Sequence, residues 1–160
     1  MDLQIVRTLH PPEVHLRQIA KLNDQAGFPT TGDVLRQRIE ELPRTDRLLL
    51  AVVENEVIGY AHLRVAHDLL ASESTEVVAI VVDQAFRRRG VGRRLITAAE
   101  VWAKETGRSR LVLRTNVLTT SAHAFYVAMG FEQAETSLVF VRSLQIDRTS
   151  EEPTKPPETV

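Results

Sequence analysis

The chain has 160 residues and a formal net charge of −1, a length at which one domain can bury a continuous core. Its 43% hydrophobic and 26% charged content is typical of a folded globular protein rather than a disordered one. Without cysteine the chain has no disulfide, no thiolate nucleophile and no cysteine-based zinc site. The near-neutral charge argues against a protein devoted to nucleic acid. No apolar run approaches the ~18 residues of a membrane span and no secretory signal is evident, so we expect a cytoplasmic protein with no membrane partner.

The first half of the sequence predicts one strand and two helices. Alternating apolar and polar residues indicate an edge strand at 3–7. Pro11 and Pro12 suit the start of a helix that ends before Gly27. A second helix is expected from Thr30 or the residues just after it, with Thr30 in a capping-box position, and Pro43 closes it.

From residue 47 the hydrophobic period changes to that of strands. We expect a hairpin of strands 48–53 and 57–66, and a third strand at 75–82 that is apolar without interruption from residue 77, as in a central strand buried on both faces. The further expected elements are a helix at 90–106, a strand at 110–115, a helix at 121–129 and a last strand at 137–144. We expect one domain at 1–145 and an unstructured tail at 146–160.

A cluster of five arginines lies between Arg87 and Arg94, where the central strand passes into the long helix. Gly90 and Gly92 stand at the start of that helix. Unpaired N–H groups at a helix N-terminus attract phosphate, and glycine lets a pyrophosphate approach them closely. The spacing does not match a Walker A loop or a dinucleotide fingerprint, which leaves another phosphate-binding loop or a solvated helix start.

Two motifs in this order resemble those of the GCN5-related N-acetyltransferase (GNAT) family. The first is Arg87-x-x-Gly90-x-Gly92, and the second is the segment 122–131, with its Phe-Tyr pair followed by Met-Gly-Phe. The resemblance covers about residues 3–144. It implies an α/β (α+β) fold with a mixed, mostly antiparallel central sheet of six to seven strands and about four flanking helices. It also implies an enzyme that transfers an acetyl group from acetyl-coenzyme A to a primary amine by direct attack in a ternary complex.

The resemblance further implies where the co-substrate binds. The loop would hold its pyrophosphate, the backbone of the central strand would hold the thioester carbonyl where neighbouring strands splay apart, and a residue after the fifth strand would contact the pantetheine arm. The residues at these places are Arg87, Arg88, Arg89, Gly90, Val91, Gly92, Arg93, Ile80, Val81, Val82 and Asn116. Asn116 is equally typical of a turn residue.

Two side chains are the candidates for proton transfer. Tyr126 stands where the family's tyrosine donates a proton to the leaving thiolate; otherwise it is a buried aromatic residue. Glu76, at the entrance of the central strand and with the parity of Ile80 and Val82, is the candidate general base; otherwise it is a solvated strand-end residue. A histidine, such as His123, or a water molecule remains an alternative base.

The acceptor is expected to be a small-molecule amine. The alternatives are a protein N-terminus or lysine, or a non-catalytic acyl-coenzyme A-binding module; a nucleic-acid partner is not expected. Acidic residues Asp68, Glu73 and Glu76 would attract a cationic acceptor. No His, Asp or Glu cluster has the spacing of metal ligands, so no metal is expected. A homodimer formed through the last strand or the second helix is an alternative to a monomer.

Overall fold

The computed structural model describes residues 1–115 and 117–146. The described residues divide into two units, residues 1–114 and the described residues between 115 and 146. The first unit contains, in chain order, β1 (Gln4–Thr8), α1 (Glu13–Gln25), α2 (Gly32–Glu40), β2 (Arg47–Val53), β3 (Glu56–Ala66), β4 (Ser74–Val82), a 3-10 turn (Gln84–Phe86), α3 (Val91–Glu105) and β5 (Leu111–Leu113). The second unit contains α4 (Thr120–Ala128).

The five strands form one sheet in the order β1-β2-β3-β4-β5. Strands β1 to β4 are antiparallel neighbours, and β5 alone runs parallel to β4. The β2–β3 hairpin turns on Glu54 and Asn55, whose φ angles of 49° and 66° match the twist of the flanking strands. The prediction of a mixed, mostly antiparallel sheet with four helices is confirmed, with five strands in the described residues rather than six to seven.

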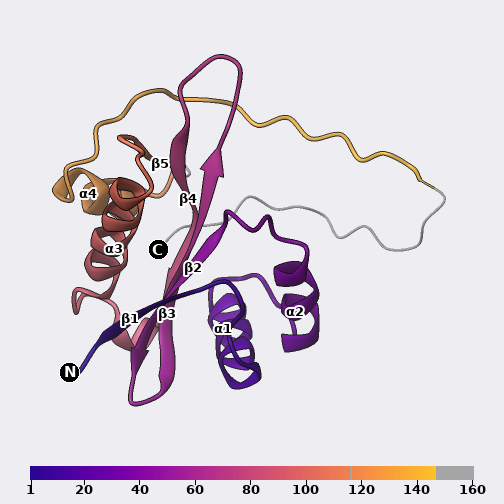
Figure 1. The fold of residues 1–160 in the computed structure, drawn as a ribbon, viewed down its shortest axis with the longest axis vertical. Coiled ribbons are helices and arrows are strands. Elements are labelled where there is room, and N and C mark those ends of the chain that lie inside the picture. The colour runs from indigo at the N-terminus through magenta and orange to yellow at the C-terminus, as the bar shows by residue number, and fades with distance from the viewer. Residues whose placement is uncertain (116, 147–160) are drawn as a thin grey trace. The chain divides into compact units, whose positions relative to one another are not determined.

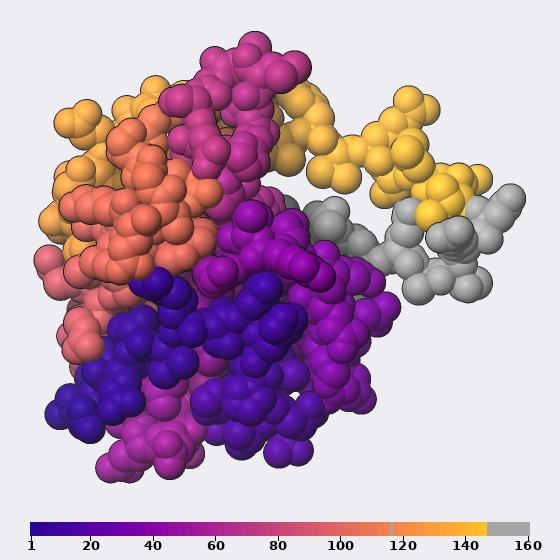
Figure 2. All heavy atoms as spheres, viewed as in Figure 1, coloured from indigo at the N-terminus to yellow at the C-terminus, as the bar shows by residue number. Residues whose placement is uncertain are grey.

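Helices cover both faces of the sheet. Helices α1 and α2 lie on one face and α3 on the other, while the β3–β4 connection projects beyond the sheet (Figure 1). The space-filling view shows β1, α1 and α2, in indigo to purple, together on the near side (Figure 2). The core under α1 and α2 contains Leu16, Ile19, Ala20, Leu22, Leu35, Leu48, Leu50, Val52, Val57 and Val81.

The N-terminus of α3 lies very close to the sheet because β3 has a glycine beneath it. A Cβ on Gly59 would stand 3.3 Å from a Val91 methyl and 3.0 Å from the Val81 carbonyl oxygen. Val91 is buried, as are Leu95 and Trp102 further along the same helix. Gly59 therefore fixes where the arginine–glycine loop enters α3.

A bulge in β4 changes which side chains share a face. Register with β3 pairs Leu63 with Val77 but His62 with Ala79, so Val78 has no partner position. Glu76 is opposite Arg64 and Ile80 is opposite Ala61, and opposed residues share a face. The prediction that Glu76 has the parity of Ile80 and Val82 is therefore wrong: Glu76 lies on the α1/α2 face and Ile80 on the α3 face.

In the second unit, the prediction of a last strand at 137–144 is wrong. Residues 131–146 contain no helix or strand, and Leu138, Phe140 and Leu144 are largely exposed. The consecutive apolar and β-branched residues of 138–141 favour a strand, but a strand exists only where a neighbouring backbone pairs with it. Residues 147–160 of the expected tail lie outside the described residues, and the single domain at 1–145 stays a prediction.

Candidate active site

The turn that follows β4 is held in shape by side chains from two places. The Asp83 carboxylate accepts a hydrogen bond from the Ala85 N–H at 2.8 Å. Gln25, the last residue of α1, accepts from the Gln84 N–H at 3.2 Å and donates to Asp83 at 3.5 Å. No local sequence signal predicts this role for Gln25, since only folding brings the end of α1 to the end of β4.

The loop itself is fixed by Arg87 and by two left-handed residues. The Arg87 Nε donates to the Val82 carbonyl oxygen at 3.2 Å. Arg88 has φ 61° and Gly90 has φ 81°. A non-glycine residue in that region costs of order 1–3 kcal/mol, and such strain concentrates at functional loops. Gly90 then caps α3 without a side-chain hydrogen bond.

The start of α3 offers backbone N–H groups to an anion. The first bond of the helical ladder runs from the Arg94 N–H to the Gly90 carbonyl at 3.0 Å. The N–H groups of Val91, Gly92 and Arg93 therefore precede the ladder. They carry the positive end of the helix dipole, and the residues present fit a pyrophosphate.

The arginines of the cluster have different partners. Arg89 lies over the Phe86 ring, 5.6 Å from its centroid, and the Arg94 guanidinium donates to the Leu3 carbonyl at 3.0 Å. Arg94 therefore ties α3 to the first strand. Arg88 and Arg93 are exposed, and in the described part of the chain their side chains have no hydrogen-bond partner.

One edge of β4 is open over its second half. Strand β5 pairs with β4 only from Thr75 to Val77, whereas β4 continues to Val82. The Asp83 N–H bonds the Ile58 carbonyl of β3 at 2.8 Å, and antiparallel pairing alternates, so the backbone groups of Ile80 and Val82 face away from β3. Ile80 thus presents its N–H and C=O at the open edge and Val82 its N–H, since the Val82 carbonyl accepts from Arg87, while the groups of Val81 face β3.

Tyr126 lies on α4, which belongs to the second unit. It is buried, and its ring makes edge contacts with Phe125 at 5.4 Å and Phe131 at 5.9 Å. The Phe131 N–H bonds the Tyr126 carbonyl, and the Gly130 N–H bonds that of Val127, with Gly130 at φ 92°. These are the two bonds of a Schellman cap. The Tyr-x-x-Met-Gly-Phe pattern therefore encodes a helix end that packs Phe131 on Tyr126.

The acidic side chains proposed to attract a cationic acceptor already have partners. The Glu76 carboxylate pairs with Arg114 at 2.8 Å, and Glu73 pairs with Arg108 and with His67 at 3.4 Å. One Asp68 oxygen accepts the N–H groups of Leu70 and Ala71. Asn116 lies outside the described residues.

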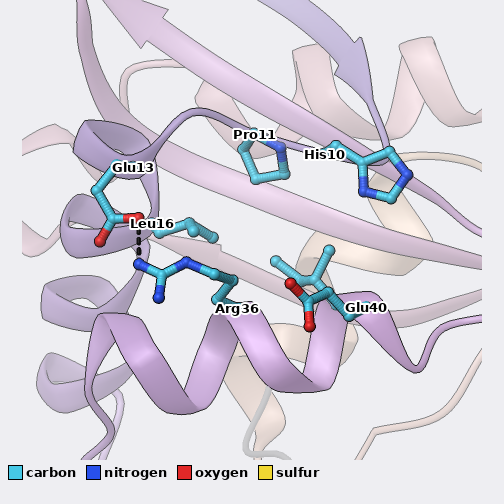
Figure 3. Close-up of a pocket in the computed structure, with 7 residues that line it drawn as sticks. His10, Pro11, Glu13, Leu16, Arg36 and Glu40 are labelled. Carbon is cyan, nitrogen blue, oxygen red and sulfur yellow. Dashed lines mark hydrogen bonds and ion pairs between the residues drawn. The ribbon is translucent and has the colours of Figure 1, made fainter.

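A pocket of about 170 Å³ lies between the β1–α1 connection, α1 and α2 (Figure 3). The Glu13 carboxylate points toward the Arg36 guanidinium across it and forms an ion pair (Figure 3). None of the loop residues or open-edge residues lines this pocket. Among the described residues no group of three or more His, Asp or Glu is arranged to hold a metal. No helix in the described part of the chain is long and apolar enough to cross a bilayer.

A helix start with unpaired N–H groups beside an open strand edge has the shape and charge that fit an extended phosphorylated ligand. Residues 14–131 match the model of the acetyltransferase (GNAT) family, and the chain belongs to that family. It is an acetyl-coenzyme A-dependent N-acetyltransferase.

Relatives and solved structures agree with this membership. The chain is 27% identical over 124 residues to an aminoglycoside N(6')-acetyltransferase type 1 of Stenotrophomonas maltophilia, covering 74% of this chain and 81% of that protein. It is 30% identical over 107 residues to the protein of that name in Salmonella typhimurium, covering 63% and 74%. The aminoglycoside acetyltransferase AAC(6')-Iy bound to a coenzyme A–acetylneamine bisubstrate analogue superposes with a TM-score of 0.77 at 23% identity, covering 90% of this chain and 100% of that one.

Proposed function

We propose that the acceptor is the primary amine of a polycationic small molecule, with an amino sugar of the aminoglycoside type as the leading candidate. The relatives named for aminoglycoside N(6')-acetylation, which match most of this chain, carry this proposal. Direct attack in a ternary complex is the mechanism we propose. The N–C bond forms as the C–S bond breaks, the thiolate takes one proton, and the other proton of the ammonium leaves to solvent.

The loop residues would bind the diphosphate part of the co-substrate. Acetyl-coenzyme A supplies the acetyl group as a thioester. The N–H groups of Val91, Gly92 and Arg93 would donate to the pyrophosphate, and the exposed Arg88 and Arg93 guanidinium groups would add charge-assisted contacts. Arg87 would hold the loop against the end of β4.

The open edge of β4 would orient the reacting carbonyl. The Ile80 N–H faces that edge, and a fixed backbone donor stabilises the negative charge that develops on a carbonyl oxygen. Tyr126 would protonate the leaving thiolate, and Glu76 or a histidine would accept the proton of the amine. Asn116 is proposed to contact the pantetheine arm.

Thiol release from acetyl-coenzyme A across a panel of amines tests the acceptor class. The panel should hold aminoglycosides, polyamines, amino acids, and peptides with a free N-terminus or lysine. A pair of aminoglycosides that differ only in a 6′-amine or 6′-hydroxyl is the sharpest comparison. We expect turnover with the amine member and little with its hydroxyl counterpart. Turnover with peptides alone would contradict the proposal.

We also propose that the enzyme is cytoplasmic and forms a homodimer. The exposed apolar side chains of Leu138, Val139, Phe140, Val141, Leu144 and Ile146 support self-association, since monomers rarely expose contiguous apolar patches. Sedimentation of the wild-type protein and of a Val139→Lys/Val141→Lys double variant tests this. A monomeric wild-type protein at micromolar concentration would contradict it.

A further inference from the structure

A buried carboxylate holds a histidine on the α1/α2 face of the sheet. Asp46, directly before β2, has a side chain that is 0% exposed, and its Oδ2 lies 2.8 Å from His62 Nε2 on β3. The His62 side chain keeps 15% of its surface exposed. A histidine that donates one ring N–H to a buried carboxylate presents its other ring nitrogen as a proton acceptor.

Asp46 is fixed from several directions. Its N–H bonds the Pro43 carbonyl at 3.0 Å, and its own carbonyl accepts from Arg47 Nη1 at 2.6 Å. Among the described residues its Oδ1 has no hydrogen-bond partner although it is buried. A buried carboxylate that is only partly satisfied is a poor contributor to stability, so its presence calls for another role.

The register of the sheet places His62 one strand away from the open edge of β4, with β4 between them. His62 is opposite Ala79 and lies on the same face of the sheet as Ala79. Ala79 is the residue directly before Ile80. Ala79 has only a methyl group to separate the imidazole from that edge. With neighbouring strands about 4.8 Å apart, a ligand at the open edge lies roughly 10 Å from the His62 backbone. The imidazole and one bridging water span this distance.

Glu76 is less well placed for the same task. It lies on the same face, but because of the bulge at Val78 it stands three register positions from Ile80, about 10 Å along the sheet at ~3.3 Å per residue. Its carboxylate is also occupied by Arg114 at 2.8 Å. A general base must reach its proton directly or through one water.

We propose that His62 is the general base of the acetyl transfer and that Asp46 is its positioning residue. The proposal rests on the proposed function. The His62 ring nitrogen opposite Asp46 accepts a proton from the attacking amine, directly or through water, as the N–C bond forms, and then releases it to solvent. The thiolate set free as the C–S bond breaks takes its own proton from another donor.

Other charged groups share this face and enter any pH profile. Tyr60 and Arg64 flank His62 on β3, Glu76 lies on β4, and the covering helices carry Glu13, Arg36 and Glu40 at their shared pocket. The test therefore compares variants in one buffer series. His62→Gln removes the titrating group and keeps a polar side chain of similar size.

We expect His62→Gln to lower kcat at least 100-fold with the coenzyme A Kd unchanged within twofold. In wild type we expect activity to fall on acidification because the base becomes protonated. In His62→Gln this fall should be absent. Asp46→Asn should lower kcat at least tenfold, whereas Glu76→Gln should keep the acidic limb of the profile. Arg7→Gln, which removes an exposed ion pair with Glu105 away from this face, is the control and should match wild type.

Three results would overturn the proposal while leaving the proposed function intact. One is a His62→Gln enzyme with wild-type kcat and profile. Another is a parallel loss of kcat and coenzyme A affinity, which indicates a structural role. The third applies if His62→Gln and Asp46→Asn both unfold, and it comes from nitrogen NMR of the His62 imidazole in the wild-type enzyme. A ring that carries its proton on Nδ1 at neutral pH contradicts the proposal, whereas an Nε2–H tautomer supports it. A wild-type enzyme that acetylates no amine would instead refute the proposed function.

Discussion

The Arg87 Nε donates a hydrogen bond to the carbonyl oxygen of Val82 across 3.2 Å. This carbonyl belongs to the end of β4, where β5 no longer pairs, and Arg87 begins the loop that leads to α3. One contact thus joins the open strand edge to the anion-binding helix start. Arg87 therefore helps to set the angle between these two elements.

Replacing Arg87 by alanine should weaken coenzyme A binding at least tenfold. The variant loses both the bond that holds the loop on β4 and a cation beside the pyrophosphate site. Isothermal titration with coenzyme A at two salt concentrations measures the effect. Arg7→Ala is the matched control, because it removes only an exposed ion pair with Glu105, worth about 0–1 kcal/mol. Equal Kd values for the two variants would contradict the assignment.

Gly92→Glu separates binding from stability. Position 92 is the second residue of α3, where a carboxylate suits the helix dipole and glycine is a poor helix former. We expect an unchanged or higher Tm together with at least a 100-fold loss of coenzyme A affinity, since the carboxylate repels phosphate. Gly32→Glu, at the first residue of α2, is the control for added charge and should bind as wild type does. Wild-type affinity in Gly92→Glu would refute the pyrophosphate site.

Tyr126→Phe tests the proton donor. The phenyl ring keeps the contacts with Phe125 and Phe131, so the fold should survive. We expect kcat to fall by about 10²-fold with the Kd of coenzyme A unchanged, because the thiolate loses its acid. Stopped-flow measurement of thiol release together with a Tm provides the readout. Full turnover with an unaltered pH profile would remove the acid role.

The buried hydroxyl of Tyr60 should make the free energy of unfolding fall at alkaline pH. Burial raises the pKa of Tyr60 to about 12, against the smaller lowering effect of its hydrogen bond with Asn23. The folded protein therefore keeps the Tyr60 proton while the unfolded chain releases it from pH 10 upward. The free energy of unfolding contributed by this group is fully present below pH 10 and falls between pH 10 and 12, by up to about 1.4 kcal/mol per pH unit.

Urea unfolding of wild type and Tyr60→Phe at several pH values from 8.5 to 11.5 measures this contribution. The variant should be about 1 kcal/mol less stable near pH 8.5 because Asn23 loses its donor. The difference should shrink above pH 10. A difference that stays constant across this range would show that Tyr60 titrates at its ordinary pKa.

The sequence by itself determined most of the elements, including the glycine-bearing start of α3. Gly90 and Gly92 at a helix start and the Gly130-Phe131 cap are local signals, because backbone conformation and capping depend on neighbours within a few residues. The sequence also indicated the hairpin and the central strand. It could not show that Thr31, rather than Thr30, caps α2 by accepting from the Val34 N–H, since both threonines stand at the helix start.

Tertiary structure alone decided the face of the sheet on which Glu76 and His62 lie. A single bulge at Val78 moves Glu76 away from the face of Ile80, because side chains alternate with a period of two and one extra residue inverts them. Asp46 and His62 are 16 residues apart and meet only when β2 pairs with β3. The predicted strand at 137–144 fails for a related reason: strand pairing depends on distant backbone, which the local apolar run at 138–141 does not specify.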